Sequence, residues 1–256
     1  MIMLPQLQNA FLRRNVLKVI SGLNNFNLDS VAATVKAADL GGATFVDIAA
    51  DQRLIHLVKS LTSLPVCVSA VEPEQFVLAV NAGADLIEIG NFDSFYAQGR
   101  KFEADEVLSL THKTRALLPE ITLSVTVPHI LTLDQQVQLA EALVQAGADI
   151  IQTEGGTSSK ATHAGTLGLI EKAAPTLAAT FEISRAVSIP VLCASGISNV
   201  TAPLAVAAGA AGVGVGSAIN QLNSEIAMIA SVRSLVESLS NSNISSPLEK
   251  IDARAY

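Results

Sequence analysis

Alanine-rich amphipathic stretches alternate with short apolar runs along most of this chain. Four turns of small residues join a stretch to the run that follows it, and Gly42, Gly83, Gly147 and Gly209 lie at their centres. A glycine after an amphipathic stretch is typical of a helix C-terminus, because it tolerates positive φ, and the apolar run after it indicates a buried strand. This alternation predicts parallel strands wrapped by helices, and we expect an α/β fold, a single (β/α)8 TIM barrel.

The apolar runs also place the individual elements. Leu4, Leu7 and Phe11 have helical spacing, which predicts an N-terminal helix over the barrel floor. Pro175 is expected to break the helical region that follows the sixth strand. The eight strands are expected at 17–21, 44–49, 66–70, 85–89, 122–127, 149–153, 191–195 and 211–215.

Length and charge limit the domain count and the class of partner. A chain of 256 residues is close to the size of one (β/α)8 domain, so we expect a barrel over residues 1–239 and a Ser- and Asn-rich tail over 240–256. The net charge of −7 disfavours nucleic acid or an anionic membrane as the main partner. It leaves room for a small phosphorylated molecule, which backbone dipoles can bind. Without a signal-peptide core near the start, a cytosol or an organelle matrix is expected. The oligomeric state stays open, a homo-oligomer being one alternative.

Polar residues occupy equivalent places in several predicted strands. Asp47, Glu88 and Gln152 each lie five residues after one of the four glycines, and Gly214 has the equivalent place in the last strand. Equivalent positions on alternate strands share one interior layer, so these side chains should point at a common centre. Lys18 is the only charge in the first strand and is expected to join them. Two roles for Lys18 stay open, a Schiff-base nucleophile or proton shuttle and a structural ion pair.

Other polar side chains extend this interior toward the strand ends. Strand five alternates hydroxyl and aliphatic residues, which directs Thr126 inward, and Ser69 on strand three is expected to join it. Glu154 should lie at the catalytic rim, near His129, which is either an acid/base residue or a solvated loop residue. No cysteine pair has the spacing of a zinc site, and we predict no metal site. The catalytic candidates are Lys18, Asp47, Glu88 and His129, and the substrate-orienting candidates are Ser69, Thr126, Gln152 and Glu154.

Glycine-containing loops follow strands seven and eight. Barrels that bind phosphate monoesters often use these two loops. Glycine leaves backbone N–H groups free to converge on phosphate oxygens. The structural alternative is a pair of tight turns between packed strands and helices. The predicted phosphate-binding residues are Gly196, Ile197, Gly216 and Ser217.

The loop over residues 91–102 is rich in aromatic side chains. It holds four of the ten aromatic residues of the chain, together with Arg100. Such a loop can form a lid or an anion clamp over the site, or an aromatic staple that fixes the loop to its neighbours. The sequence leaves these roles open.

Three functions fit these residues. The first is an enzyme that binds a small phosphorylated metabolite and uses a Lys/carboxylate centre for aldol-type, isomerising or condensing chemistry. The second is an oxidoreductase in which the same loops hold flavin mononucleotide. The third is a non-catalytic sensor or assembly factor that binds a phosphorylated ligand without turnover. The sequence alone names neither substrate nor process.

Four segments together carry a resemblance that covers nearly the whole chain. They are residues 19–26, 46–51, 88–100 and 152–159. The chain resembles the family of hypothetical chloroplast reading-frame proteins of algal plastid genomes and cyanobacteria. The resemblance implies an aldolase-type barrel located in a cyanobacterial cytoplasm or a chloroplast stroma. It implies no reaction and no catalytic residues.

Overall fold

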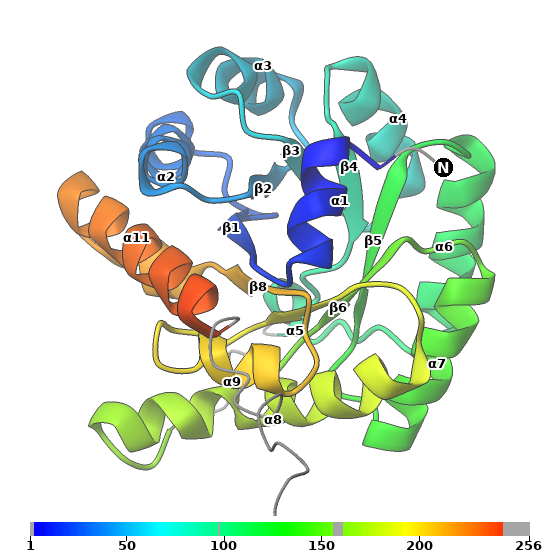
Figure 1. The fold of residues 1–256 in the computed structure, drawn as a ribbon. Helices are drawn as coiled ribbons and strands as arrows, with labels where there is room; N and C mark the ends of the chain where they lie inside the picture. Colours follow the sequence, from blue (N-terminus) through cyan, green and yellow to red (C-terminus); the bar gives the residue numbers. More distant parts are fainter. Residues whose placement is uncertain (1–2, 97, 156–160, 243–256) are drawn as a thin grey trace, which may run out of the picture.

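Eight parallel strands pair in chain order and close into a barrel, so the predicted (β/α)8 fold is confirmed (Figure 1). The computed structural model describes residues 3–96, 98–155 and 161–242. Strand β1 is hydrogen-bonded to both β2 and β8, which closes the sheet. The strands are β1 (Val16–Gly22), β2 (Phe45–Ala49), β3 (Val66–Ala70), β4 (Leu86–Ile89), β5 (Thr122–Val127), β6 (Ile150–Thr153), β7 (Val191–Ala194) and β8 (Gly212–Val215).

Helices surround the strands and cover their outer, aliphatic faces (Figure 1). Two apolar clusters lie between the strands and this helical layer, one on each half of the barrel. The helices are α1 (Pro5–Leu12), α2 (Leu28–Gly41), α3 (Gln52–Leu61), α4 (Pro73–Asn81), α5 (Asp93–Tyr96), α6 (Ala104–Leu117), α7 (Leu133–Gln145), α8 (Gly165–Ala186), α9 (Ala202–Ala207), α10 (Ser217–Asn220) and α11 (Glu225–Ser242).

Helix α1 closes the N-terminal end of the barrel, as its apolar spacing predicts. Leu7 and Phe11 are buried in one cluster with the first inward-facing residues of the strands, among them Val16, Phe45 and Leu86. In Figure 1, α1 lies across the middle of the ring of strands. The polar residues further along each strand therefore lie between this apolar floor and the carboxyl ends of the strands.

The predicted helix-stop glycines have the expected conformation. Gly42, Gly83, Gly147 and Gly209 have φ of 86°, 106°, 96° and 116°. After α2, the N–H of Ala43 returns to a helix carbonyl oxygen at 2.9 Å, which closes the helix end. Each glycine therefore fixes where the next strand begins, and so which residues of that strand face the barrel interior.

The expected break at Pro175 is wrong, because α8 runs through it from Gly165 to Ala186. A proline in a helix removes one backbone hydrogen bond and costs about 3 kcal/mol. Here the ring lies on the exposed face, and the next turns pack on the barrel. The hydroxyls of Thr176 and Thr180 both contact the Thr153 hydroxyl of β6, at 2.7 and 3.1 Å. This tertiary packing anchors the helix after the proline, and the buried residues Gly168 and Ala173 anchor it before the proline.

Two further segments contain short helices. The loop after β4 contains the short helix α5, and the region after β8 forms two helices, α10 and α11. Helix α11 ends at Ser242, so it includes the first three residues of the tail expected over 240–256. Most of that predicted tail, residues 243–256, lies outside the described residues. Within the described residues, no helix is long and apolar enough to cross a membrane.

Candidate functional site

A polar layer lies directly above the apolar floor and is closed to solvent. Lys18, Asp47, Glu88 and Gln152 are each at most 2% exposed. The Lys18 ammonium is 2.7 Å from Glu88 Oε2 and 3.2 Å from Asp47 Oδ2. It also donates to Gln152 Oε1 at 3.0 Å. An ammonium has three protons, so each acceptor takes one of them. The structure thus brings Lys18 together with the three side chains that equal spacing from the glycines assigned to one centre.

Hydroxyl and amide groups complete this layer. Ser69 Oγ donates to Asp47 Oδ1 at 2.6 Å. Ser124 Oγ donates to Glu88 Oε2 at 2.7 Å. Asn91 covers the layer from above, with Nδ2 at 3.2 Å from Asp47 and 3.3 Å from Glu88. Both carboxylates are therefore bound by several donors, which offsets part of the cost of burying them.

The electrostatics of this layer favour the ion-pair role of Lys18. Burial lowers the pKa of Lys18, but Asp47 and Glu88 outweigh this effect and raise it overall. Burial also raises the pKa of Glu88, while Lys18 opposes the rise. A Schiff-base nucleophile needs an unprotonated amine, which a depressed pKa provides. A closed, fully paired ammonium with a raised pKa is the opposite arrangement.

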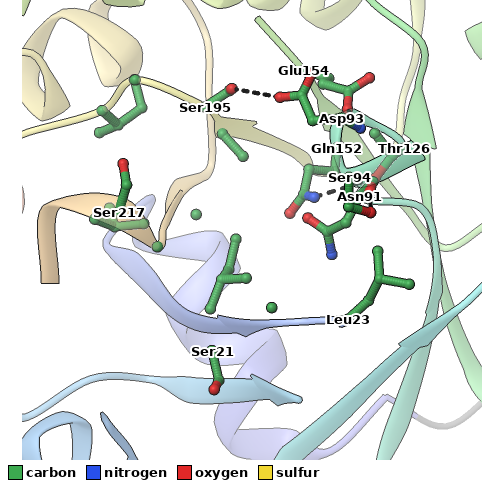
Figure 2. A pocket seen from close by; sticks show the side chains of 18 of the residues that line it. Ser21, Leu23, Asn91, Asp93, Ser94, Thr126, Gln152, Glu154, Ser195 and Ser217 are labelled. Carbon is green, nitrogen blue, oxygen red and sulfur yellow. Dashed lines mark hydrogen bonds between the residues drawn. The ribbon is translucent and has the colours of Figure 1, made fainter. Parts of the chain in front are cut away.

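A cavity of about 530 Å³ opens above the polar layer, at the carboxyl ends of the strands (Figure 2). Gln152 and Asn91 connect the two, since each lines the cavity and hydrogen-bonds to Glu88 below it. Thr126 and Glu154 line the cavity as well. Four candidates lie beneath the wall of this cavity instead of lining it: Lys18, Asp47, Ser69 and Glu88.

Two residues with unusual backbone conformation border the same cavity. Asn91 and Ser195 have φ of 62° and 78°, in the left-handed region that non-glycine residues rarely occupy. Such conformations cost about 1–3 kcal/mol each and cluster at functional sites. Among the described residues the one other non-glycine case is Arg14, which follows α1. The strain therefore favours a functional reading of this cavity.

The two glycine loops form one side of the cavity, and α8 adds a cation to it. Gly196, Ile197, Gly216 and Ser217 all line the cavity. Lys172 also lines the cavity. Its backbone packs closely on the first loop, as shown by the 2.6 Å that would separate a Cβ on Gly196 from the Lys172 carbonyl oxygen. Gly196 is therefore required by close packing, as the tight-turn alternative predicts, and it also lines the cavity. In the described part of the chain, no carboxylate lies within ion-pair distance of Lys172.

A histidine and two carboxylates meet at the cavity rim. His129 Nδ1 lies 3.3 Å from Glu154 Oε2 and 3.5 Å from Asp93 Oδ1. The hydrogen bond with Glu154 raises the pKa of His129; burial opposes the rise and the two carboxylates add to it. Figure 2 shows Asp93 and Glu154 on the same side of the cavity, with a hydrogen bond of 3.4 Å from Ser195 to Asp93. His129 is thus tied to the site instead of being an ordinary loop residue.

The aromatic loop is fixed to the barrel. Phe92 and Phe102 are fully buried and stack with ring centroids 4.4 Å apart. The Arg100 guanidinium lies 4.4 Å from the centre of the Phe102 ring and pairs with Glu106. Arg100 does not line the cavity described above. The contacts therefore favour the staple over the lid or anion clamp.

Asn91, Asp93 and Lys172 are among the residues of the site that were not sequence candidates. Asn91 lies two residues after the end of β4, and a polar residue near the carboxyl end of a barrel strand was a usable signal. Asp93 lies in a loop and Lys172 on a helix, and nothing in their local pattern distinguishes them from exposed charges. Residues 156–160, which include the end of the segment 152–159 named above, lie outside the described residues.

The fold and the cavity place this chain in the class of (β/α)8 barrels that have glycine loops after β7 and β8 at the mouth of the barrel. Within it, the chain belongs to the family described as "Protein of unknown function (DUF561)", which matches residues 3–245. A similar protein, "Uncharacterized protein ycf23" of Cyanophora paradoxa, is 48% identical over 225 residues, 88% of this chain and 92% of that protein. The protein of the same name from Pyropia yezoensis is 41% identical over 219 residues, 86% and 80% of the two chains. The predicted membership in a plastid and cyanobacterial family is confirmed.

Solved structures with a similar fold include several enzymes. Thiamine phosphate pyrophosphorylase from Pyrococcus furiosus has a TM-score of 0.59 at 19% identity, covering 90% of this chain and 98% of its own. (S)-3-O-geranylgeranylglyceryl phosphate synthase from Thermoplasma acidophilum, in complex with substrate sn-glycerol-1-phosphate, has a TM-score of 0.61 at 16% identity, covering 94% and 100%. 3-Hexulose-6-phosphate synthase has a TM-score of 0.61 at 16% identity, covering 87% and 99%. At these identities the likeness shows the fold.

Proposed function

We propose that this protein is an enzyme that acts on a small phosphorylated metabolite, whose phosphate is held by the loops after β7 and β8. The observation that carries the proposal is the convergence of Gly196, Gly216 and Lys172 on one cavity. The glycine loops offer backbone N–H donors, and the lysine offers a positive charge. On a chain with a net charge of −7, such a local cation is what an anionic ligand needs.

The reaction we propose is aldol-type, isomerising or condensing. Such reactions move a proton beside a carbonyl group and require a donor that polarises the carbonyl oxygen. From the phosphate end, the ligand would extend toward Gln152 and Thr126 at the cavity floor and toward Glu154 at the rim. His129 contacts Glu154 and Asp93 at the rim, and its hydrogen bond with Glu154 raises its pKa, which favours the protonated ring and makes His129 our candidate proton donor.

In this proposal Lys18 positions other groups and does not react. It holds Gln152 directly, and through Glu88 it holds Asn91, so it orients two amides that face the ligand. The competing imine mechanism makes a distinct prediction, since borohydride would trap a sugar phosphate on Lys18. Peptide mass analysis that finds Lys18 unmodified while turnover proceeds would support the positioning role.

Two comparisons support the general kind of function. Several solved neighbours are named for phosphorylated compounds, namely thiamine phosphate, sn-glycerol-1-phosphate and hexulose 6-phosphate. The relatives of the family are plastid and cyanobacterial proteins, which supports a chloroplast stroma or a cyanobacterial cytoplasm as the site of action.

The test is a binding measurement with a matched lysine control. Inorganic phosphate, triose phosphates and pentose phosphates are titrated into the wild type and Lys172→Met by calorimetry, with the unphosphorylated sugars in parallel. Loss of one charge-assisted contact costs about 1.5–3 kcal/mol, a weakening of about 10- to 100-fold. Lys113→Met, on an exposed face of α6, should bind like the wild type.

The outcomes separate the three functions. No phosphate-dependent binding, or equal binding by Lys172→Met, would refute the phosphate site. Binding without turnover of any added phosphometabolite would favour the sensor or assembly factor. Tight binding of flavin mononucleotide, seen as a coloured complex, would favour the oxidoreductase.

A further inference from the structure

Three separate segments bring metal-binding donors together at the cavity rim. Asp93 begins α5, His129 follows β5 and Glu154 follows β6. One carboxylate oxygen from each acid and one ring nitrogen of the histidine all lie within 4.8 Å of one another. Because the set combines an imidazole with two carboxylates, it differs from an ordinary cluster of acidic surface residues.

The distances within this set suit a shared ion better than direct pairing. A charge-assisted hydrogen bond between nitrogen and oxygen is about 2.7–2.9 Å long. His129 Nδ1 is 3.3 Å from Glu154 and 3.5 Å from Asp93, longer than that in both cases. Two donors that each bind one ion at about 2.0–2.2 Å, at tetrahedral or octahedral angles, lie about 3.0–3.5 Å apart. The two separations from His129 are therefore close to those of neighbouring ligands.

The surroundings hold the Glu154 carboxylate in place and leave its charge to be balanced. Glu154 is 5% exposed and accepts from the Asp93 N–H at 2.7 Å and from the Tyr96 hydroxyl at 3.3 Å. Across the described ranges it has no lysine or arginine partner. Burying a carboxylate is costly, and a divalent ion in place of the His129 proton supplies the balancing charge.

We infer that Asp93, His129 and Glu154 bind one divalent transition-metal ion, Zn²⁺ or Mn²⁺ being the best suited to imidazole and carboxylate ligands. Asp93 and Glu154 line the cavity, so the remaining coordination positions face the space of the ligand. The binding inference stands on this geometry, and its catalytic consequence rests on the proposed function. In that reaction the ion, in place of the His129 proton, polarises the carbonyl oxygen.

The test measures metal uptake without any substrate. Chelator-treated protein is titrated separately with Zn²⁺, Mn²⁺ and Mg²⁺ by calorimetry, and bound metal is counted by elemental analysis. We expect one equivalent of Zn²⁺ or Mn²⁺ in the wild type and a weakening of more than about 100-fold in His129→Ala. His163→Ala is the matched control, because His163 pairs with Glu171 at an exposed position away from the set and should bind metal like the wild type.

A second variant protects the test against misfolding. Asp93→Asn keeps the shape of the side chain and removes its charge, and circular dichroism confirms that each variant is folded. Absence of saturable uptake by the wild type, or equal affinity in His129→Ala and Asp93→Asn, would overturn the metal site. That result would leave the Lys172-dependent phosphate binding intact, whereas failure of phosphate binding would leave metal uptake unchanged, so the two failures are distinguishable.

Discussion

Replacing Lys18 with methionine removes the one cation of the buried polar layer while keeping a side chain of similar length. In the native layer the ammonium serves Asp47, Glu88 and Gln152 at 2.7–3.2 Å. In Lys18→Met, two buried carboxylates face one another without a cation. Removal of one partner from a buried ion pair costs about 3–5 kcal/mol of unfolding free energy. We expect a loss of this size near neutral pH, the largest of any single lysine substitution in the described chain.

The pH dependence of that loss has a definite sign. The raised pKa of Lys18 means that its stabilising charge is present below its ordinary pKa of 10.5 and is lost as pH rises through the folded-state value. The raised pKa of Glu88 means that its neutral form is favoured in the fold. Without Lys18 this preference grows, because the opposing cation is gone. Acidification should therefore neutralise Glu88 in the variant and make the loss smaller at about pH 5 than at about pH 8.

Urea unfolding at both pH values measures these differences directly. Lys113→Met, at an exposed position of α6, is the control and should change stability by less than about 0.5 kcal/mol. The double variant Lys18→Met/Glu88→Gln should lose less unfolding free energy than the sum of the losses of the two single variants. Each single variant leaves a buried charge without its partner, whereas the double variant removes both charges. A loss below about 1 kcal/mol for Lys18→Met, or one that does not depend on pH, would refute the ion-pair argument.

Three further substitutions test the packing of the site. Gly214→Ala places a Cβ 2.9 Å from the Ala194 Cβ and 3.2 Å from Gln152 Oε1, so it should cost about 1–3 kcal/mol in urea unfolding and weaken ligand binding by displacing the amide. Phe102→Ala removes a fully buried ring and should cost about 3–5 kcal/mol in the same assay. Arg100→Ala should leave phosphate affinity unchanged by calorimetry if the loop is a staple, and a tenfold weakening would restore the anion clamp.

The fold and the polar layer follow from the sequence because both depend on register. A helix-stop glycine such as Gly42 fixes where a strand starts, and the alternation of a strand then decides which side chains face inward. Asp47 and Glu88 could be assigned to one centre in this way, and so could Gln152. The continuity of helix α8 through Pro175 could not be predicted in this way. It depends on the packing of Thr176 and Thr180 against β6, and the local sequence pattern does not show such a long-range contact.

The rim of the site was harder to predict because loops and helices contribute to it without periodicity. Asp93 lies close to His129 and Glu154 because the loop expected over residues 91–102 contains a short helix, which Asp93 begins. Lys172 reaches the cavity because α8 packs against the Gly196 turn. Neither distance in the sequence nor residue type signals these approaches. These contacts depend on how the outer helices and loops pack against the barrel.

The separation of the buried layer from the rim argues for a division of roles between them. The groups around Lys18 satisfy one another and lie out of reach of a ligand, so a reaction there would first have to break the network that holds it. At the rim, Asp93 and Glu154 face the cavity, and His129, whose pKa is raised, contacts both carboxylates. Gln152 and Asn91 belong to both, because each is fixed from below and exposed to the ligand above. The buried charges thus keep these amides rigid, and the chemistry belongs to the rim.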